Sequence, residues 1–139
     1  MEQLIEMLKR HEGVRSHVYK CSAGYESIGV GRNISKTGLG LSEDEVQYLL
    51  ESDISRVIKE LSSEYPWFND LDDVRKDAMI DISFNLGATR LRGFKRALAA
   101  MDAADYKTAS LEFLDSKWSR VVKGRSTELA YMIEMGEYL

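Results

Sequence analysis

Three side chains near the N-terminus supply the groups that hydrolysis of a glycosidic bond requires. Eight residues separate Glu12 from Cys21, and five separate Cys21 from Ser27. Cleavage of such a bond needs an acid that protonates the leaving oxygen and, in the inverting route, a base that activates water on the other face of the sugar. A carboxyl group can be the acid, a thiolate can be the base or a nucleophile, and a hydroxyl can hold a water. Glu12 is a candidate general acid, or a surface glutamate at a helix end, and Cys21 and Ser27 are the thiol and hydroxyl groups that follow it in the chain.

A short helix would carry the candidate acid. Apolar residues at helical spacing, Leu4, Ile5 and Leu8, predict an N-terminal helix over residues 1–12, which Gly13 would end in the left-handed conformation. The acid then lies in the last helical turn. The negative end of the helix dipole favours a protonated carboxyl group there, which suits a general acid.

The segment from His17 to Gly31 has the pattern of a β-hairpin. Strand-forming Val, Tyr and Ile residues alternate with glycines, and Ser22-Ala23-Gly24 is suited to a tight turn. This places Cys21 at the turn and Ser27 on the returning strand.

The remainder of the chain has the periodicity of helices. Ser42 and Glu45 have the form of a capping box, and the apolar residues that follow predict a long amphipathic helix that Pro66 ends. Residues 71–86 carry apolar side chains on almost all sides, which indicates a buried helix stopped by Gly87. Shorter helices are expected over residues 93–101, 106–116 and 126–135.

These features together resemble the phage-type lysozymes, glycoside hydrolase family 24. The family signature is Glu, eight residues, Asp or sometimes Cys, five residues, Thr, and this chain has Ser in place of Thr. Later family landmarks follow in the same order, so that the resemblance covers nearly the whole chain: Leu71-Asp72-Asp73-Val74-Arg75, Phe84-Asn85-Leu86-Gly87, Gly93-Phe94 and Ser116-Lys117-Trp118.

The resemblance implies an α+β, mainly α, lysozyme-like fold with two lobes. A small hairpin lobe would span about residues 13–41 and a linking helix about residues 42–61. The larger helical lobe would comprise about residues 66–139 together with the N-terminal helix 1–12. Residues 1–139 would form a single domain, which suits the length of the chain.

The same resemblance implies an endolysin-type muramidase, a glycoside hydrolase of the lysozyme type. Such an enzyme cuts the β-1,4 bond between N-acetylmuramic acid and N-acetylglucosamine in the glycan strands of peptidoglycan. Because aspartate is the more usual residue at the position of Cys21, the alternative is a catalytically weakened or inactive peptidoglycan-binding module. A thiol peptidase that pairs Cys21 with His11 or His17 matches no protease motif and would leave Glu12 without a role.

Three roles for Cys21 stay open. Its thiolate would position or activate water, or attack the sugar carbon with retention at about 5 Å from Glu12, or the residue would be a turn cysteine without a chemical role. A thiol with an ordinary pKa is ionised only a few per cent at neutral pH, and the neighbouring Lys20 would lower that pKa. Ser27 retains the hydroxyl that the family's threonine supplies and can still hold a water.

The resemblance also implies a glycan-binding cleft with residues from both lobes. Tyr25 and Asn33 are the candidates from the hairpin lobe, and Phe84 and Asn85 resemble the family's aromatic and amide pair at the end of the buried helix. Arg125 resembles a family arginine that pairs with the catalytic acid. Such a pair would oppose the effect of the helix dipole, so the sequence does not give the direction of the net shift in the Glu12 pKa. Two further residues are expected to be structural: Arg32 as an ion-pair partner and Trp118 in the core.

Composition limits the partners. A net charge of −4 argues against nucleic acid, because neutralising phosphates needs a basic surface. Attraction to the carboxylates of the cell wall would depend on two local basic patches. The alternative is that both patches are solvated helix faces without a binding role. The first patch contains Arg90, Arg92, Lys95 and Arg96, and the second contains Lys117, Arg120, Lys123 and Arg125.

Cofactors and membrane insertion have no support in the sequence. One cysteine gives no disulfide and no framework for a zinc site, and no phosphate-binding or metal-binding motif is present. We therefore expect no metal, no cofactor and a monomer. No apolar run is long enough to cross a membrane, and the first helix leaves no room for a signal peptide. An endolysin of this kind would accumulate in the host cytoplasm and reach the cell wall through a hole in the membrane that another protein, a holin, forms.

Overall fold

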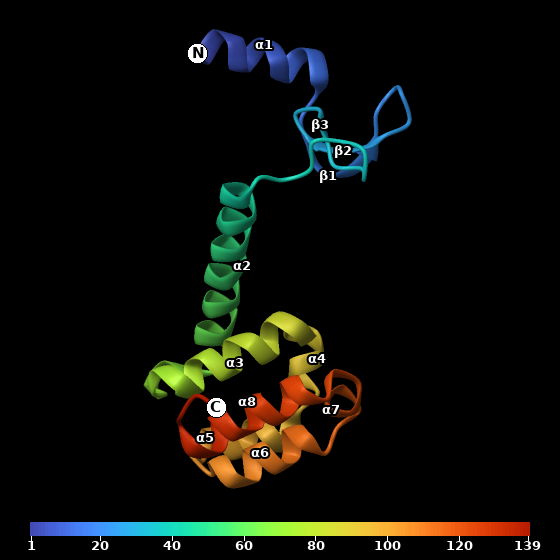
Figure 1. Ribbon diagram of the computed structural model, residues 1–139. Coiled ribbons are helices and arrows are strands. Elements are labelled where there is room, and N and C mark those ends of the chain that lie inside the picture. The colour runs from blue at the N-terminus through green and yellow to red at the C-terminus, as the bar shows by residue number, and fades with distance from the viewer. The chain divides into compact units, whose positions relative to one another are not determined.

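The computed structural model describes all residues from Met1 to Leu139 and divides into two compact units. The first unit is Met1–Leu49 and the second is Leu50–Leu139 (Figure 1). The boundary falls inside helix α2, Glu43–Glu64. The chain is mainly helical with one small sheet near its N-terminus, which confirms the predicted fold class.

The first unit contains a helix and a three-stranded antiparallel sheet. Helix α1 spans Glu2–Glu12, and the strands in sheet order are β1 (Arg15–Lys20), β2 (Glu26–Gly29) and β3 (Arg32–Asn33). The predicted helix and hairpin are confirmed, whereas β3 was not predicted. Gly13 ends α1, but its φ of 78° and ψ of 163° lie outside the expected left-handed helical region. This extended conformation at positive φ is accessible almost only to glycine.

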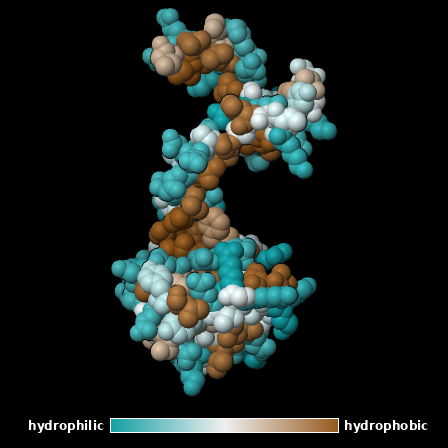
Figure 2. Space-filling view, in the orientation of Figure 1, coloured by the Kyte–Doolittle hydropathy of each residue, from teal (hydrophilic) through white to brown (hydrophobic).

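The first unit has no apolar core of its own. Its single buried side chain is Ser27, and α1 buries none of its residues. Leu4, Ile5 and Leu8 of α1 remain exposed, and Figure 2 shows apolar side chains gathered along that helix. Strand pairing and the hydrogen bonds of the turns therefore define the geometry of the sheet in this unit.

Helix α2 begins at the predicted capping box. The backbone N–H of Ser42 donates to Glu45 Oε1 at 2.9 Å, and the backbone N–H of Glu45 donates to Ser42 Oγ at 3.2 Å. These two bonds satisfy N–H groups that a helix start leaves unpaired. The helix continues to Glu64, beyond the expected end at about residue 61, and Pro66 then begins the 3₁₀ helix η1, Pro66–Asp70.

Six further helices form the second unit: α3 (Asp73–Leu86), α4 (Ala88–Arg92), α5 (Lys95–Asp102), α6 (Tyr106–Leu114), α7 (Lys117–Val122) and α8 (Gly124–Met135). Four of them were predicted, and the short α4 and α7 were not. Helix α3 starts later than expected because Asp72 caps it, with its side chain accepting from the backbone N–H of Arg75. The expectation that α3 is buried on almost all sides is wrong, since Phe84 and Asn85 are exposed.

The core of the second unit is apolar. Its buried residues come from α2, η1 and all six helices, including Met79, Ile82 and Phe113. The Phe113 ring lies 5.5 Å from that of Phe94 and 6.5 Å from that of Trp118, measured between ring centroids. This confirms the predicted core position of Trp118. None of the helices combines the length and the apolar character that crossing a bilayer requires.

Candidate functional site

The hairpin turn fixes the position of Cys21. The backbone N–H of Gly24 donates to the Cys21 carbonyl at 2.8 Å, and the backbone N–H of Cys21 donates to the Tyr25 carbonyl at 2.9 Å. Gly24 has a φ of 86°, which glycine adopts at no steric cost. The predicted place of Cys21 at the turn is confirmed, and its side chain is half-buried.

This turn favours the thiolate form of Cys21. Hydrogen bonding from the backbone of Tyr25, and then of Ala23, holds the pKa of the Cys21 thiol below its ordinary value, although partial burial opposes the effect. The Ser27 hydroxyl and the backbone of Gly24 add to the lowering. The expected contribution of Lys20 to this pKa is wrong, because the lowering comes from groups of the turn and of β2.

Ser27 lies next to Cys21 on the returning strand, as predicted. It stands opposite Tyr19 of β1 and Asn33 of β3, and only 2% of it is exposed. Its Oγ donates to the Tyr25 carbonyl at 3.3 Å, and the same hydroxyl lies near enough to the Cys21 thiol to help lower its pKa. The structure therefore places two of the three predicted catalytic residues beside each other.

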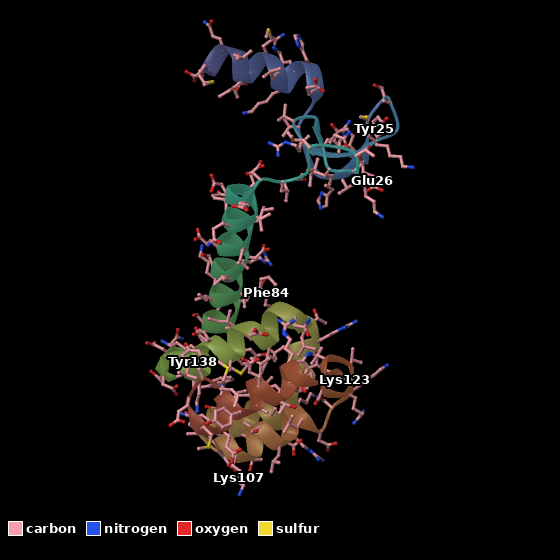
Figure 3. All side chains as sticks on the ribbon, viewed as in Figure 1. Tyr25, Glu26, Phe84, Lys107, Lys123 and Tyr138 are labelled. Atoms are coloured by element: carbon pink, nitrogen blue, oxygen red, sulfur yellow. The ribbon has the colours of Figure 1, made fainter.

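Asn33 lies beside this pair but is engaged in its own loop. Its Oδ1 accepts from the backbone N–H of Ser35 at 3.0 Å and from the Ser35 hydroxyl at 2.7 Å. A sugar contact would thus fall to its Nδ2 group, and its role in binding stays a prediction. Tyr25, labelled in Figure 3, is 48% exposed, and its ring is available to a ligand.

Glu12 occupies the last turn of α1, as predicted, and its side chain reaches the turn between β2 and β3. Its carboxylate lies against the backbone of Gly31, which has a φ of 72°. The candidate acid and the Cys21–Ser27 pair therefore belong to one compact unit. Its action as an acid stays a prediction.

Arg32 anchors the strand that follows this contact. Its Nη1 donates to Glu45 Oε1 at 2.8 Å and to the Gly40 carbonyl at 3.0 Å. The hydrogen bond from Arg32, followed by that from the Ser42 backbone, lowers the pKa of Glu45 to about 2. The prediction that Arg32 is an ion-pair partner is confirmed.

The predicted glycan contacts of the second unit have partners within that unit. The Trp118 Nε1–H donates to Asn85 Oδ1 at 2.7 Å, and Arg125 Nε donates to Asp81 Oδ1 at 2.8 Å. Phe84, also labelled in Figure 3, is 43% exposed and free to contact a ligand. The pairing of Arg125 with the catalytic acid stays a prediction.

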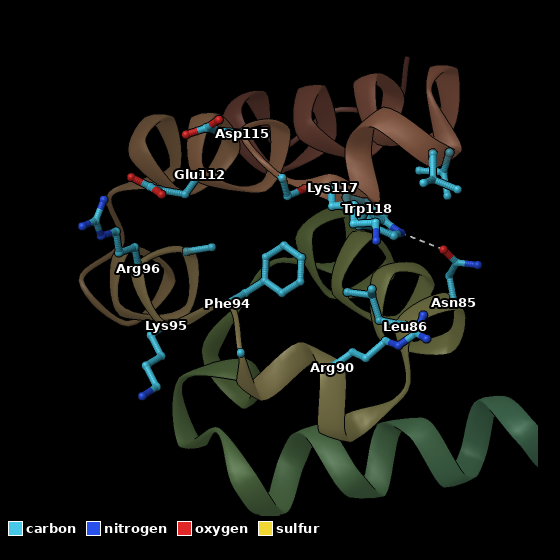
Figure 4. A pocket seen from close by; sticks show the side chains of 15 residues that line it. Asn85, Leu86, Arg90, Phe94, Lys95, Arg96, Glu112, Asp115, Lys117 and Trp118 are labelled. Atoms are coloured by element: carbon cyan, nitrogen blue, oxygen red, sulfur yellow. Dashed lines mark hydrogen bonds between the residues drawn. The ribbon is translucent and has the colours of Figure 1, made fainter.

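A pocket of about 910 Å³ lies within the second unit, and no sequence motif predicted it (Figure 4). Apolar side chains line it, among them Phe94 and Trp118. Its charged lining residues make no ion pair: the cations Arg90, Lys95, Arg96 and Lys117 and the anions Glu112 and Asp115. We call this set the charged rim.

Only part of the first basic patch predicted from the sequence lines the pocket. Arg90, Lys95 and Arg96 belong to the rim, whereas Arg92 forms an ion pair with Glu64, with 2.5 Å between Nε and Oε1. Three of the four cations thus share one pocket. Of the second patch, Lys117 alone lines the pocket.

Comparison with known proteins gives matches along most of the chain. Residues 9–130 match the family model described as Phage lysozyme. The chain is 30% identical over 135 residues to an endolysin of Acyrthosiphon pisum secondary endosymbiont phage 1, covering 96% of this chain and 89% of that protein. It is 27% identical over 158 residues to probable T4-type lysozyme 1 of Dictyostelium discoideum, covering 94% and 93%. It is 28% identical over 159 residues to the pre-baseplate central spike protein Gp5 of Enterobacteria phage T4, covering 96% of this chain and 28% of that protein. The family match includes every predicted site residue.

Proposed function

Because the chain belongs to the phage lysozyme family, we propose that it is a muramidase that hydrolyses the β-1,4 bond between N-acetylmuramic acid and N-acetylglucosamine in peptidoglycan. The observation that carries this proposal is the first unit, which holds Glu12 and a Cys21–Ser27 pair whose thiol has a lowered pKa. An acid and an ionisable base or nucleophile are the two groups that the reaction needs.

In this mechanism Glu12 donates its proton to the glycosidic oxygen as the bond to the sugar carbon breaks. Its place in the last turn of α1, with its carboxylate beside the turn between β2 and β3, supports this role. A positioned acid of this kind contributes about 10² to 10⁴ in rate.

The Cys21 thiolate completes the reaction by one of two routes. In the inverting route it takes a proton from the attacking water and becomes a neutral thiol, while Ser27 holds that water. In the retaining route the thiolate attacks the sugar carbon and forms a thioglycosyl intermediate, which water then hydrolyses with Glu12 as base. The lowered pKa of Cys21 serves both routes, because each begins from the thiolate.

Each unit, taken by itself, has exposed groups that suit the glycan or its attached peptides. Tyr25 and Phe84 offer exposed aromatic rings, whose faces suit the apolar faces of sugars. The charged rim has four cations and two anions, which suits the carboxylates of the wall better than an uncharged polymer. The pocket lining therefore carries a net positive charge although the net charge of the whole chain is −4.

Two settings fit the enzyme. As an endolysin it would accumulate in the host cytoplasm as a monomer and reach the wall after a holin opens the membrane, and its match to a phage endolysin supports this setting. The match to a phage spike protein supports the second setting, in which a lysozyme domain acts from the virion. We favour the endolysin, because the chain covers 89% of that relative and 28% of the spike protein.

Product analysis tests the proposal and its alternative, a peptidoglycan-binding module without activity. Purified peptidoglycan is digested, and the new reducing ends are reduced with borohydride and identified by mass spectrometry. We expect reduced N-acetylmuramic acid. Reduced N-acetylglucosamine would contradict the proposed bond. Binding without any new reducing end would support the inactive module, the alternative that the atypical cysteine at position 21 favours.

A further inference from the structure

Two glycines, Gly29 at the end of β2 and Gly31 in the turn between β2 and β3, have a similar φ but differ in what surrounds them. Gly29 has a φ of 71° and Gly31 a φ of 72°. A Cβ added at Gly29 would meet no atom within 4 Å. A Cβ added at Gly31 would lie 2.8 Å from Glu12 Oε2, 3.1 Å from Glu12 Cδ and 3.3 Å from Glu12 Cγ.

This contact distinguishes Gly31 among the positive-φ glycines of the first unit. The other four have open space where a Cβ would stand: Gly13, Gly24, Gly29 and Gly40. Positive φ alone therefore explains a glycine at those positions. At Gly31 a second reason applies, because a methyl group would occupy space that the Glu12 carboxylate uses.

The backbone of Gly31 is held in place from its C-terminal side. Arg32 follows directly and donates to the Gly40 carbonyl and to Glu45, whose carboxylate also accepts from the backbone N–H of Ser42. Ile28 and Arg32 are partners across the two strands, which closes the turn around Gly31. The surface against which the Glu12 carboxylate rests is therefore fixed by several hydrogen bonds.

We propose that Gly31 is a positioning residue for the general acid: its missing side chain leaves the space in which the Glu12 carboxylate must lie to protonate the glycosidic oxygen. This inference rests on the proposed function of Glu12. Carbon atoms in contact prefer about 3.5 to 4.0 Å, so a methyl group at position 31 would push the carboxylate away. The carboxylate is the flexible end of its side chain, so we expect it to move while the fold remains.

The experiment compares Gly31→Ala with Gly29→Ala, which imposes similar backbone strain without touching Glu12. A displacement of about 1 Å in a catalytic group can lower a rate about 10²-fold. We expect Gly31→Ala to lower kcat on purified glycan strands about 100-fold with little change in KM, and Gly29→Ala to stay within a few-fold of the parent. Equal activity of the two variants would overturn the proposal.

A second measurement is independent of activity. The carboxyl carbon of Glu12 is observed by ¹³C NMR in the parent and in both variants, and we expect its resonance to move in Gly31→Ala but not in Gly29→Ala. An unmoved resonance in both variants would overturn the inferred contact. If the parent failed to release reducing ends, the proposed function would fall, while this resonance would still decide whether position 31 places the carboxylate.

Folding has its own control. If Gly31→Ala alone did not fold, Glu12→Ala in the same chain should restore folding to the level of Gly29→Ala, because the side chain that the methyl group displaces is then absent. A double variant that remained unfolded would overturn the proposal.

Discussion

The two units of this protein are stabilised by different interactions. In Met1–Leu49 the single buried side chain is the polar Ser27, and turns, a capping box and positive-φ glycines set the geometry. In Leu50–Leu139 a continuous apolar core includes aromatic contacts between Phe94, Phe113 and Trp118. The candidate chemical groups all lie in the first unit, and most of the buried apolar surface lies in the second.

This difference implies that activity and stability depend on different residues. Burial of apolar side chains is the dominant favourable contribution to folding, so the second unit supplies most of the stability. The first unit gains its geometry from directional hydrogen bonds, which can place a thiol or a carboxylate accurately but contribute little net free energy each. Variants in the two units should therefore separate the two properties.

The largest effect on stability is expected in the aromatic core. Phe113→Ala removes a ring that is 1% exposed and contacts two other rings, so we expect the free energy of unfolding to fall by about 3 to 5 kcal/mol. Denaturant unfolding measures this, and Leu111→Ala on the same helix, where the side chain is 58% exposed, should change it little. Similar losses in both variants would contradict the assignment of the core.

A large effect on activity without loss of stability is expected at Cys21. Cys21→Ala should lower hydrolysis about 10²-fold or more, the usual contribution of a positioned base. In the parent the rate should rise with pH through a thiol pKa that lies below the ordinary value, and Cys21→Asp should keep activity without that rising limb. An alanine variant with the parent's rate and pH profile would make Cys21 a turn residue only.

The same pH profile can be sharpened at Ser27. Since its hydroxyl lowers the pKa of the Cys21 thiol, Ser27→Ala should move the rising limb to higher pH. Ser22→Ala is the matched control, because Ser22 lies in the same turn but is exposed and has no part in the lowering. A limb that moved equally in both variants would contradict the contribution of Ser27 to the pKa of the Cys21 thiol.

A smaller effect with the opposite sign is expected in α3. The Ser83 side chain is 2% exposed, and its hydroxyl has no hydrogen-bond partner. Ser83→Ala removes this unpaired group and should raise the free energy of unfolding by about 1 kcal/mol.

Ser116→Ala should lower the free energy of unfolding by about 1 kcal/mol, because Ser116 Oγ caps α7 by accepting from the backbone N–H of Ser119 at 3.0 Å. Thermal unfolding of the two variants side by side tests both signs.

The smallest effect is expected at the charged rim. Arg96→Gln removes an unpaired cation and should weaken binding to peptidoglycan a few-fold at low salt, with less effect at high salt because ions screen the attraction. Arg92→Gln should leave binding nearly unchanged, since Arg92 is already paired with Glu64. A pull-down on purified wall with the inactive Glu12→Gln background measures both, and equal weakening would remove the rim from the account.

Sequence patterns predicted the longer elements because several residues repeat the same signal. Three such signals are the capping box of α2, the end of α3 at Gly87 and the hairpin turn next to Cys21. In each, a residue type that favours a cap or turn stands beside a run of apolar residues at helix or strand spacing. The short elements β3, η1, α4 and α7 have too few residues for any period to emerge, and tertiary contacts determine them.

The candidate site was predictable in its residues but not in its contacts. The pKa of the Cys21 thiol is lowered chiefly by hydrogen bonds from backbone N–H groups. Every residue except proline has such a group, so the sequence does not reveal which ones reach the thiol, and the neighbouring Lys20 was wrongly expected to be the cause. Asn85 and Trp118 are 33 positions apart, and no periodicity links them. The contact of Gly31 with Glu12 joins a turn to a helix end, and a glycine leaves no chemical signal of such proximity.

One paired measurement on Glu12→Gln tests the division between chemistry and stability most directly. Hydrolysis of peptidoglycan and the unfolding midpoint are measured for the parent, for this variant and for Glu6→Gln on an exposed position of the same helix. We predict that Glu12→Gln loses about 10² to 10⁴ in rate, because the amide cannot donate the proton, while its unfolding midpoint equals that of the parent and Glu6→Gln keeps both. Turnover close to that of the parent in Glu12→Gln would contradict the account, because the first unit would then lack its acid.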